Sequence, residues 1–362
     1  MKNIPNITGL RFFLAVCVII MHVSEFCSKH EIPFYNDLPI FNKGYEAVCM
    51  FFSLSGFLII RQLYIEKKMF NTISLKNFFK RRSLRIFPLY FLILFYGLLH
   101  YNYILPKAGF AGDYNNNYNL IEGMLLSVFF MPNVFASLYS PGGIIEILWS
   151  IGVEEQFYLF IAPLLLLIPL KKHISFLLLF TIIFFCACFY IENNWLSKFG
   201  MLFFYFTSSG IISILLLEGN ILFKSKIFGI VLISLFVLYF TTDIFSLFFS
   251  KANYNLTSML LFSLVIGFLS CKPFVLLNNN LITYFGKISY GIYVYHAIVI
   301  QFLGFFYLKF VVNMGMNNLI IVIFNVLVIV ITIAISHFSY QYFEKFFMKF
   351  YSGTSLSRKN LH

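Results

Sequence analysis

Residues 9–29 read GLRFFLAVCVIIMHVSEFCSK, an apolar run that carries two ionisable side chains in its interior, Arg11 and His22. A helix needs about 20 mostly apolar residues to cross the hydrocarbon core of a bilayer. This run has that length, and no small-residue cleavage site follows it, so we interpret it as a first membrane span rather than a removable signal peptide. Similar runs recur along the chain, which predicts an all-α fold, a polytopic bundle of transmembrane helices.

The composition supports a lipid environment. Of 362 residues, 60% are hydrophobic and only 11% are charged, with 50 phenylalanines and 23 tyrosines. A soluble domain of this size could not remove so much apolar surface from water. We predict ten spans, at residues 9–29, 44–64, 86–105, 146–168, 173–191, 199–217, 226–244, 254–271, 283–307 and 318–341. The apolar segment 120–137 contains Pro132 and is either a re-entrant piece or a further span.

The net charge of +12 is explained by membrane topology rather than by a nucleic-acid partner. With ten spans and cytoplasmic termini, 20 of the 26 basic residues lie in cytoplasmic segments. This asymmetry favours an even number of spans with both ends inside. We assign residues 1–345 to one membrane-embedded domain and residues 346–362 to a short polar cytoplasmic tail. The six cysteines show no spacing typical of metal ligands, so no metal site is predicted.

Arg11 and His22 fall on one helix face. Eleven residues at about 100° each complete roughly three turns, which separates the two side chains by about 16 Å along the axis. Arg11 either extends to the lipid interface or faces a polar site. His22 is either a hydrogen-bonded packing residue or a general base, because a near-neutral imidazole can accept a proton from a hydroxyl group.

A basic cluster precedes the third span, where residues 80–90 read KRRSLRIFPLY. Arg82 and Arg85 are three residues apart and therefore share a face. They are either anchors at the cytoplasmic interface or a clamp for the phosphates of a cytoplasmic donor such as a nucleotide or coenzyme A. Arginine suits the second role because its guanidinium group binds phosphate through two parallel hydrogen bonds.

Residues 148–158 read LWSIGVEEQFY and place Glu154 and Glu155 at the predicted outer end of the fourth span. Acids at the start of a helix interact well with its dipole, which is one explanation. The other is that Glu154 orients or charges a histidine, or that the acids bind sugar hydroxyls. Trp149 and Tyr158 would then add aromatic surface for a saccharide.

Two more segments carry polar side chains into spans. In ISYGIYVYH, residues 288–296, Ser289, Tyr293 and His296 line one helix face and serve either helix–helix hydrogen bonding or a site. In FSLSGFLI, residues 52–59, the small residues predict close helix packing.

These five segments, taken in order over almost the whole chain, resemble the acyltransferase-3 family of bacterial integral membrane O-acyltransferases, in its stand-alone form without a fused esterase-like domain. The resemblance implies ten helices, cytoplasmic termini and a bacterial inner-membrane location. It also implies a cytoplasmic acyl-CoA co-substrate, no tightly bound cofactor and a carbohydrate or glycolipid acceptor. By motif, His22 and Glu154 become catalytic candidates. The donor candidates are Arg11, Arg82 and Arg85. The acceptor-binding candidates are Trp149, Glu155, Tyr158, Ser289, Tyr293 and His296.

The resulting hypothesis is transfer of an acyl group, with acetyl expected, from acyl-CoA to a hydroxyl of a surface polysaccharide or glycolipid. His22 would either remove the hydroxyl proton or carry the acyl group transiently. A separate extracytoplasmic partner or a homo-oligomer is compatible with this reading. The alternative is a transporter or a glycan or lipid flippase, in which the buried charges line a pathway and no bond is made.

Overall fold

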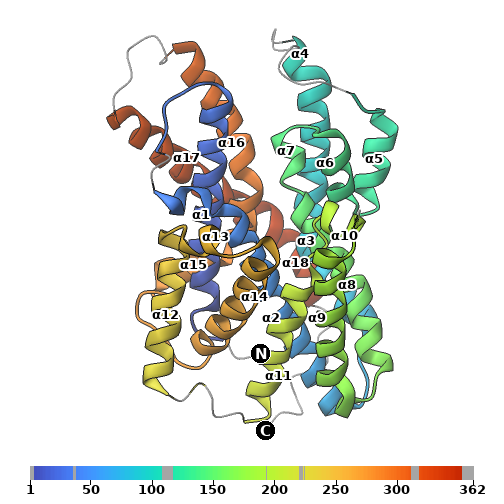
Figure 1. Ribbon diagram of the computed structural model, residues 1–362. Helices are drawn as coiled ribbons and strands as arrows, with labels where there is room; N and C mark the ends of the chain where they lie inside the picture. The colour runs from blue at the N-terminus through green and yellow to red at the C-terminus, as the bar shows by residue number, and fades with distance from the viewer. Residues whose placement is uncertain are drawn as a thin grey trace.

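The computed structural model describes residues 4–35, 38–107, 117–192, 194–219, 223, 225–310 and 318–352. Within these ranges the secondary structure is helical and contains no strand, which confirms the predicted all-α class (Figure 1). Eight helical segments are long and apolar enough to cross a membrane. They are built on α1 (Ile7–Lys29), α2 (Gly44–Phe70), α3 (Leu75–Leu99), α8 (Trp149–Leu167), α9 (His173–Tyr190), α14 (Lys251–Leu269), α16 (Ser289–Phe310) and α17 (Asn318–Phe338).

The two remaining predicted spans are shorter helices. α11 (Phe203–Leu217) has 15 residues and α12 (Lys226–Thr241) has 16. At 1.5 Å per residue each reaches about 24 Å, which is less than the roughly 30 Å of a bilayer core. All ten predicted segments are therefore helical, but only eight have spanning length. Whether both termini face the cytoplasm stays a prediction.

Shorter helices complete the described chain. They are η1 (Pro39–Asn42), the π-helix η2 (His100–Ile104), α4 (Leu105–Lys107), η3 (Leu170–Lys172), α10 (Trp195–Lys198), α13 (Ile244–Phe248), α15 (Asn280–Lys287), the π-helix η6 (Ser339–Glu344) and α18 (Lys345–Ser352). The first residues of the predicted polar tail thus belong to α18, and residues 353–362 of it lie outside the described residues.

The ambiguous segment 120–137 forms two short helices rather than one span. α5 (Leu120–Val128) has nine residues and α6 (Pro132–Tyr139) has eight, and a turn joins them. Neither helix is long enough to cross a bilayer core. Pro132 explains the break, because proline fits the first turn of a new helix and not the interior of a continuing one.

A glycine turn then leads into α7 (Gly143–Glu146). Gly142 has a φ of 107°, and a Cβ atom there would lie 2.4 Å from the ring of Tyr101. Both the backbone conformation and the ring contact therefore require glycine. The amide of Ile144 donates to the Tyr101 hydroxyl over 3.0 Å, which fixes α7 against the end of the α3 segment.

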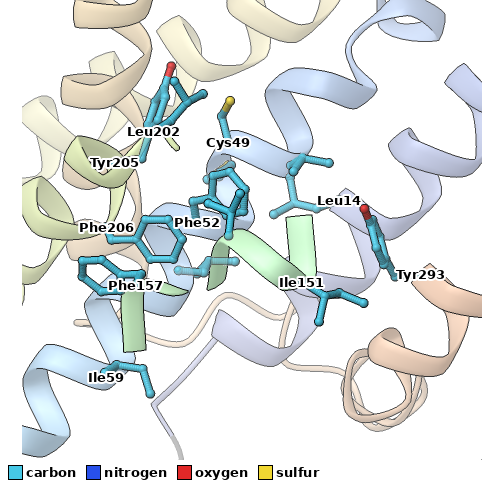
Figure 2. Packing of buried hydrophobic residues seen from close by; sticks show 14 of the residues in the cluster. Leu14, Cys49, Phe52, Ile59, Ile151, Phe157, Leu202, Tyr205, Phe206 and Tyr293 are labelled. Atoms are coloured by element: carbon cyan, nitrogen blue, oxygen red, sulfur yellow. The ribbon is translucent and has the colours of Figure 1, made fainter. Parts of the chain in front are cut away.

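The centre of the bundle is the contact between α2 and α11. A Cβ atom on Gly56 would lie 2.0 Å from the carbonyl oxygen of Phe206, so only glycine permits this approach. The ring of Phe206 stacks on Phe52 at 4.8 Å and on Phe157 at 4.3 Å between ring centroids (Figure 2). The Ser209 hydroxyl also donates to a backbone carbonyl of α2. The predicted packing role of the small residues in the second span is confirmed at Gly56.

Candidate active site

Five helices enclose a first cavity, which we call the arginine cavity. It contains about 740 Å³ of space between atoms, part of it open to solvent. α1, α2, α3, α8 and α16 line it with Arg11, Val48, Phe51, Phe52, Ser55, Arg82, Arg85, Ile86, Ser150, Ile151, Glu154, Tyr158, Ser289, Tyr290 and Tyr293. The structure thus brings the three predicted donor arginines together from two helices that are far apart in sequence.

Glu154 is the carboxylate of this cavity. The hydroxyl of Ser55 donates to its Oε1 over 2.8 Å, and the hydroxyl of Tyr158 donates to its Oε2 over 2.8 Å. The guanidinium carbon of Arg82 lies 5.6 Å from the centre of the Tyr158 ring, a cation–π distance. Three guanidinium groups facing one carboxylate leave an excess of positive charge, which favours an anionic ligand.

The predicted partnership between Glu154 and a histidine is wrong. Both Glu154 oxygens accept bonds from Ser55 and Tyr158, and the carboxylate faces the arginines. The sequence reading placed this acid near the outer end of its span. In the structure Glu154 lies one turn of α8 after Ser150 and lines the arginine cavity, because α7 and the first turn of α8 come before it.

Two predicted acceptor contacts of the same motif lie outside both cavities described here. Trp149 stacks on Tyr45 at 6.1 Å and meets Phe52 edge-on at 5.7 Å, so it is a packing residue. Glu155 is 4% exposed and its Oε1 has no hydrogen-bond partner within the described structure. The third, Tyr158, lines the arginine cavity instead of an acceptor site.

A second cavity, the histidine cavity, contains about 1120 Å³ of space between atoms, part of it open to solvent. Its lining is His22, Glu25, Phe26, Lys29, Asn117, Tyr139, Ser140, Gly142, Gly143, Glu146, Ile147, Ala297, Ile300 and Gln301. It lies between α1 and α16 on one side and the end of α6 with α7 on the other, in the upper half of Figure 1.

His22 is 28% exposed, and its Nδ1 lies 2.7 Å from Oε2 of Glu25, one turn further along α1. When the imidazole is neutral, this contact favours the tautomer in which Nδ1–H donates to the carboxylate. Nε2 then keeps its lone pair and can accept a proton. Arg11 and His22 were predicted to share one helix face, and in the structure each lines a different cavity.

The polar stripe of α16 occupies the boundary between the two cavities. Ser289 and Tyr293 line the arginine cavity. His296 is fully buried and its ring stacks on that of His22, with 5.1 Å between ring centroids. Ser289 and Tyr293 thus line one cavity together, His296 contacts His22 beside the other, and the role of all three in acceptor binding stays a prediction.

The structure adds site residues that the sequence reading missed. Glu25, Glu146 and Gln301 line the histidine cavity, and Ser55 holds Glu154. Glu25 had a visible signal, since an acid three residues after a histidine shares its helix face. Glu146 and Gln301 had none, because they meet His22 only through the packing of α7 and α16 against α1.

The comparisons with known proteins show the family of the chain. The family model described as "Acyltransferase domain" matches residues 4–337, so the chain belongs to the acyltransferase-3 family and is a multi-pass membrane acyltransferase. This membership confirms the predicted enzyme class and favours it over the flippase alternative. No solved structure matches the chain.

Three relatives show the range of similarity. The chain is 26% identical over 321 residues to "Putative acetyltransferase ORF330" of Acidianus two-tailed virus, covering 83% of this chain and 84% of that one. It is 28% identical over 172 residues to the peptidoglycan O-acetyltransferase OatA of Listeria monocytogenes, covering 47% and 25%. A "Putative O-acetyltransferase" of Staphylococcus aureus is 21% identical over 392 residues, covering 96% and 58%. The chain thus spans only part of the bacterial relatives.

Proposed function

We propose that this protein is a membrane O-acetyltransferase that moves an acetyl group from cytoplasmic acetyl-CoA to a hydroxyl of a surface carbohydrate or glycolipid. The observation that carries the proposal is the pair of adjacent cavities, one lined by three arginines and the other by the His22–Glu25 pair. The similarity to proteins named O-acetyltransferases supports acetyl as the transferred group.

The arginine cavity is the proposed donor site. Arg11, Arg82 and Arg85 would bind the diphosphate and the 3′-phosphate of coenzyme A, since guanidinium groups bind phosphate oxygens in pairs. Glu154 interacts electrostatically with Arg11 and Arg82. Its bonds from Ser55 and Tyr158 hold it in place. We infer that Glu154 positions these arginines, a role that was not among the alternatives drawn from the sequence.

The histidine cavity is the proposed acceptor site. Nε2 of His22 would remove the proton of the acceptor hydroxyl as its oxygen attacks the thioester carbonyl carbon. The new carbon–oxygen bond forms, the carbon–sulfur bond breaks, and the proton passes from His22 to the sulfur of the departing coenzyme A. Glu25 would orient the ring and stabilise the imidazolium that forms. Carboxylates and amides around the cavity are suitable partners for sugar hydroxyls.

The proposed location is the bacterial inner membrane, with the arginine cavity reached from the cytoplasm and the histidine cavity from the opposite side. The positive-inside distribution of basic residues supports this orientation. In the predicted topology the acetyl group crosses the bilayer within the protein, and the coenzyme A stays on the cytoplasmic side.

The test uses the purified full-length protein with labelled acetyl-CoA and glycans extracted from cells that lack the gene. We expect acetyl transfer to the glycan fraction, seen as an added acetyl mass. His22→Ala should lower the rate by roughly 100- to 10,000-fold, the usual contribution of a general base. Full activity in His22→Ala would exclude the mechanism. His173→Ala is the matched control, because His173 lies outside both cavities.

A further inference from the structure

The Tyr293 side chain contacts residues of both cavities. The hydroxyl of Tyr293 lies 2.7 Å from Oγ of Ser150 and donates to the carbonyl of Ile147 over 3.0 Å. Tyr293 and Ser150 line the arginine cavity, whereas Ile147 lines the histidine cavity. The phenol therefore joins α16 to the α7–α8 junction at the point where one cavity ends and the other begins.

The next turn of α16 connects this junction to His22. Nδ1 of His296 contacts the carbonyl oxygen of Tyr293 at 2.5 Å, and the His296 ring stacks on His22. His296 is exposed to neither cavity, because none of its surface is accessible. Its Nε2 has no hydrogen-bond partner within the described structure.

The Tyr293 side chain is almost entirely buried. Tyr293 is 8% exposed and lies beside Leu14 and Ile151 at the edge of the buried core (Figure 2). With the phenol bonded to both Ser150 and Ile147, the Tyr293 ring lies between residues that line the arginine cavity and a residue that lines the histidine cavity. Two hydrogen bonds are a modest barrier, because each contributes only a small net stabilisation.

We propose, on the basis of the function proposed above, that Tyr293 is the positioning residue that separates donor from acceptor. Its two hydrogen bonds hold the thioester away from His22 and from the water of the histidine cavity until the phenol swings aside. Tyr293 thereby suppresses a wasteful side reaction. In that reaction water attacks the thioester carbonyl, the carbon–sulfur bond breaks, and acetate and coenzyme A are released.

The experiment compares acetyl-CoA hydrolysis without acceptor to acetyl transfer with acceptor, in full-length protein. Tyr293→Phe keeps the ring and loses both hydrogen bonds, so the ratio of hydrolysis to transfer should rise roughly tenfold. Ser150→Ala loses one of the two bonds and should give a smaller rise. Tyr239→Phe is the matched control, because its buried phenol bonds Ser258 at 2.6 Å and neither residue lines either cavity, so the ratio should not change.

The outcomes are distinguishable. A wild-type ratio in Tyr293→Phe, with transfer intact, overturns the separating role and leaves the proposed function standing. Loss of both reactions in a folded Tyr293→Phe protein also overturns it, because the phenol would then take part in the chemistry. No thioester cleavage by wild type, with acetyl-CoA affinity unaffected by Arg82→Ala, overturns the proposed function itself.

Discussion

At the residue scale, the histidine that the sequence singles out acquires a partner in the structure. His22 and Glu25 are one helical turn apart on α1, and both line the same cavity. The Glu25 side chain is 61% exposed, so its contact with His22 adds little to the stability of the fold. Its effect is to hold one tautomer of the imidazole. This pair is local in sequence, and it is the part of the site that needs no tertiary contact to form.

Glu25→Gln should lower the transfer rate by roughly 10- to 100-fold, less than the loss from His22→Ala. An amide can still accept a hydrogen bond, but it cannot stabilise the imidazolium. The Michaelis constant for acetyl-CoA should stay at its wild-type value, because Glu25 does not line the arginine cavity. Steady-state kinetics on the two variants check this. A raised Michaelis constant with an unchanged rate would contradict the assignment.

At the element scale, two devices hold the helices that carry the site. Glycine lets α2 and α11 approach until Gly56 touches backbone. At the C-terminal end of α8, the Lys67 ammonium donates to the carbonyls of Leu165 and Leu166 over 2.7 and 2.8 Å, and also to that of Ile168. Lys67 thus caps a helix end, so this basic residue has a structural role in addition to its topological one.

Gly56→Ala should destabilise the protein by about 1–3 kcal/mol, the usual cost of forcing extra atoms into a packed contact. The added methyl group would meet the carbonyl of Phe206, which cannot rotate away. Thermal unfolding in detergent measures the change. Gly143→Ala is the control, since a Cβ atom there meets nothing within 4 Å. Equal unfolding temperatures for the two variants would disprove the packing argument.

We expect the stability of the protein to depend on pH through Glu218, at the end of α11. The Lys68 ammonium donates to Glu218 over 2.6 Å and the Tyr64 hydroxyl donates to it over 3.0 Å, and these bonds lower the pKa of Glu218 below its ordinary value of 4.5. Because the pKa of Glu218 is lower in the folded state, its contribution to the free energy of unfolding is present above the unfolded-state pKa. This contribution is lost as the pH falls through the folded-state pKa. The contribution is small because the pair is exposed.

Glu218→Gln should therefore lower the unfolding temperature slightly at neutral pH, and the difference from wild type should fade as the pH falls below 4.5 and through the lowered folded-state pKa of Glu218. Thermal scans over a pH series measure it. The same variant should transfer acetyl at the wild-type rate, because Glu218 lies outside both cavities. A difference that persists in acid would show that the carboxylate charge is not its cause.

At the scale of the whole molecule, donor and acceptor chemistry occupy separate cavities. Arg82→Ala should weaken acetyl-CoA binding by roughly 10- to 100-fold through the loss of a charge-assisted contact. His22→Ala should leave that affinity at its wild-type value. Calorimetry with the purified protein measures both, and Lys171→Ala, an exposed lysine outside both cavities, controls for net charge. Equal weakening in the His22 and Arg82 variants would contradict the separation.

Composition and residue spacing were enough to predict the class of fold and the polar residues that need a site. Apolar runs long enough to span a bilayer must form helices, because lipid offers no partners for backbone groups. The same reasoning marks Arg11, His22, Arg82, Arg85 and Glu154 as residues that require a polar environment. The two short helices α11 and α12 could not be told from full spans, since helix ends depend on packing.

Which of those residues meet depends on how the helices pack. Arg11 and His22 share a helix face, yet Tyr293 and His296 of a distant helix separate the cavities that they line. Glu154 joins the arginines because Ser55 of α2 approaches it, not because of its own spacing. Periodicity along one helix specifies a direction from its axis. The partner in that direction comes from the packing of other helices, which no local pattern encodes.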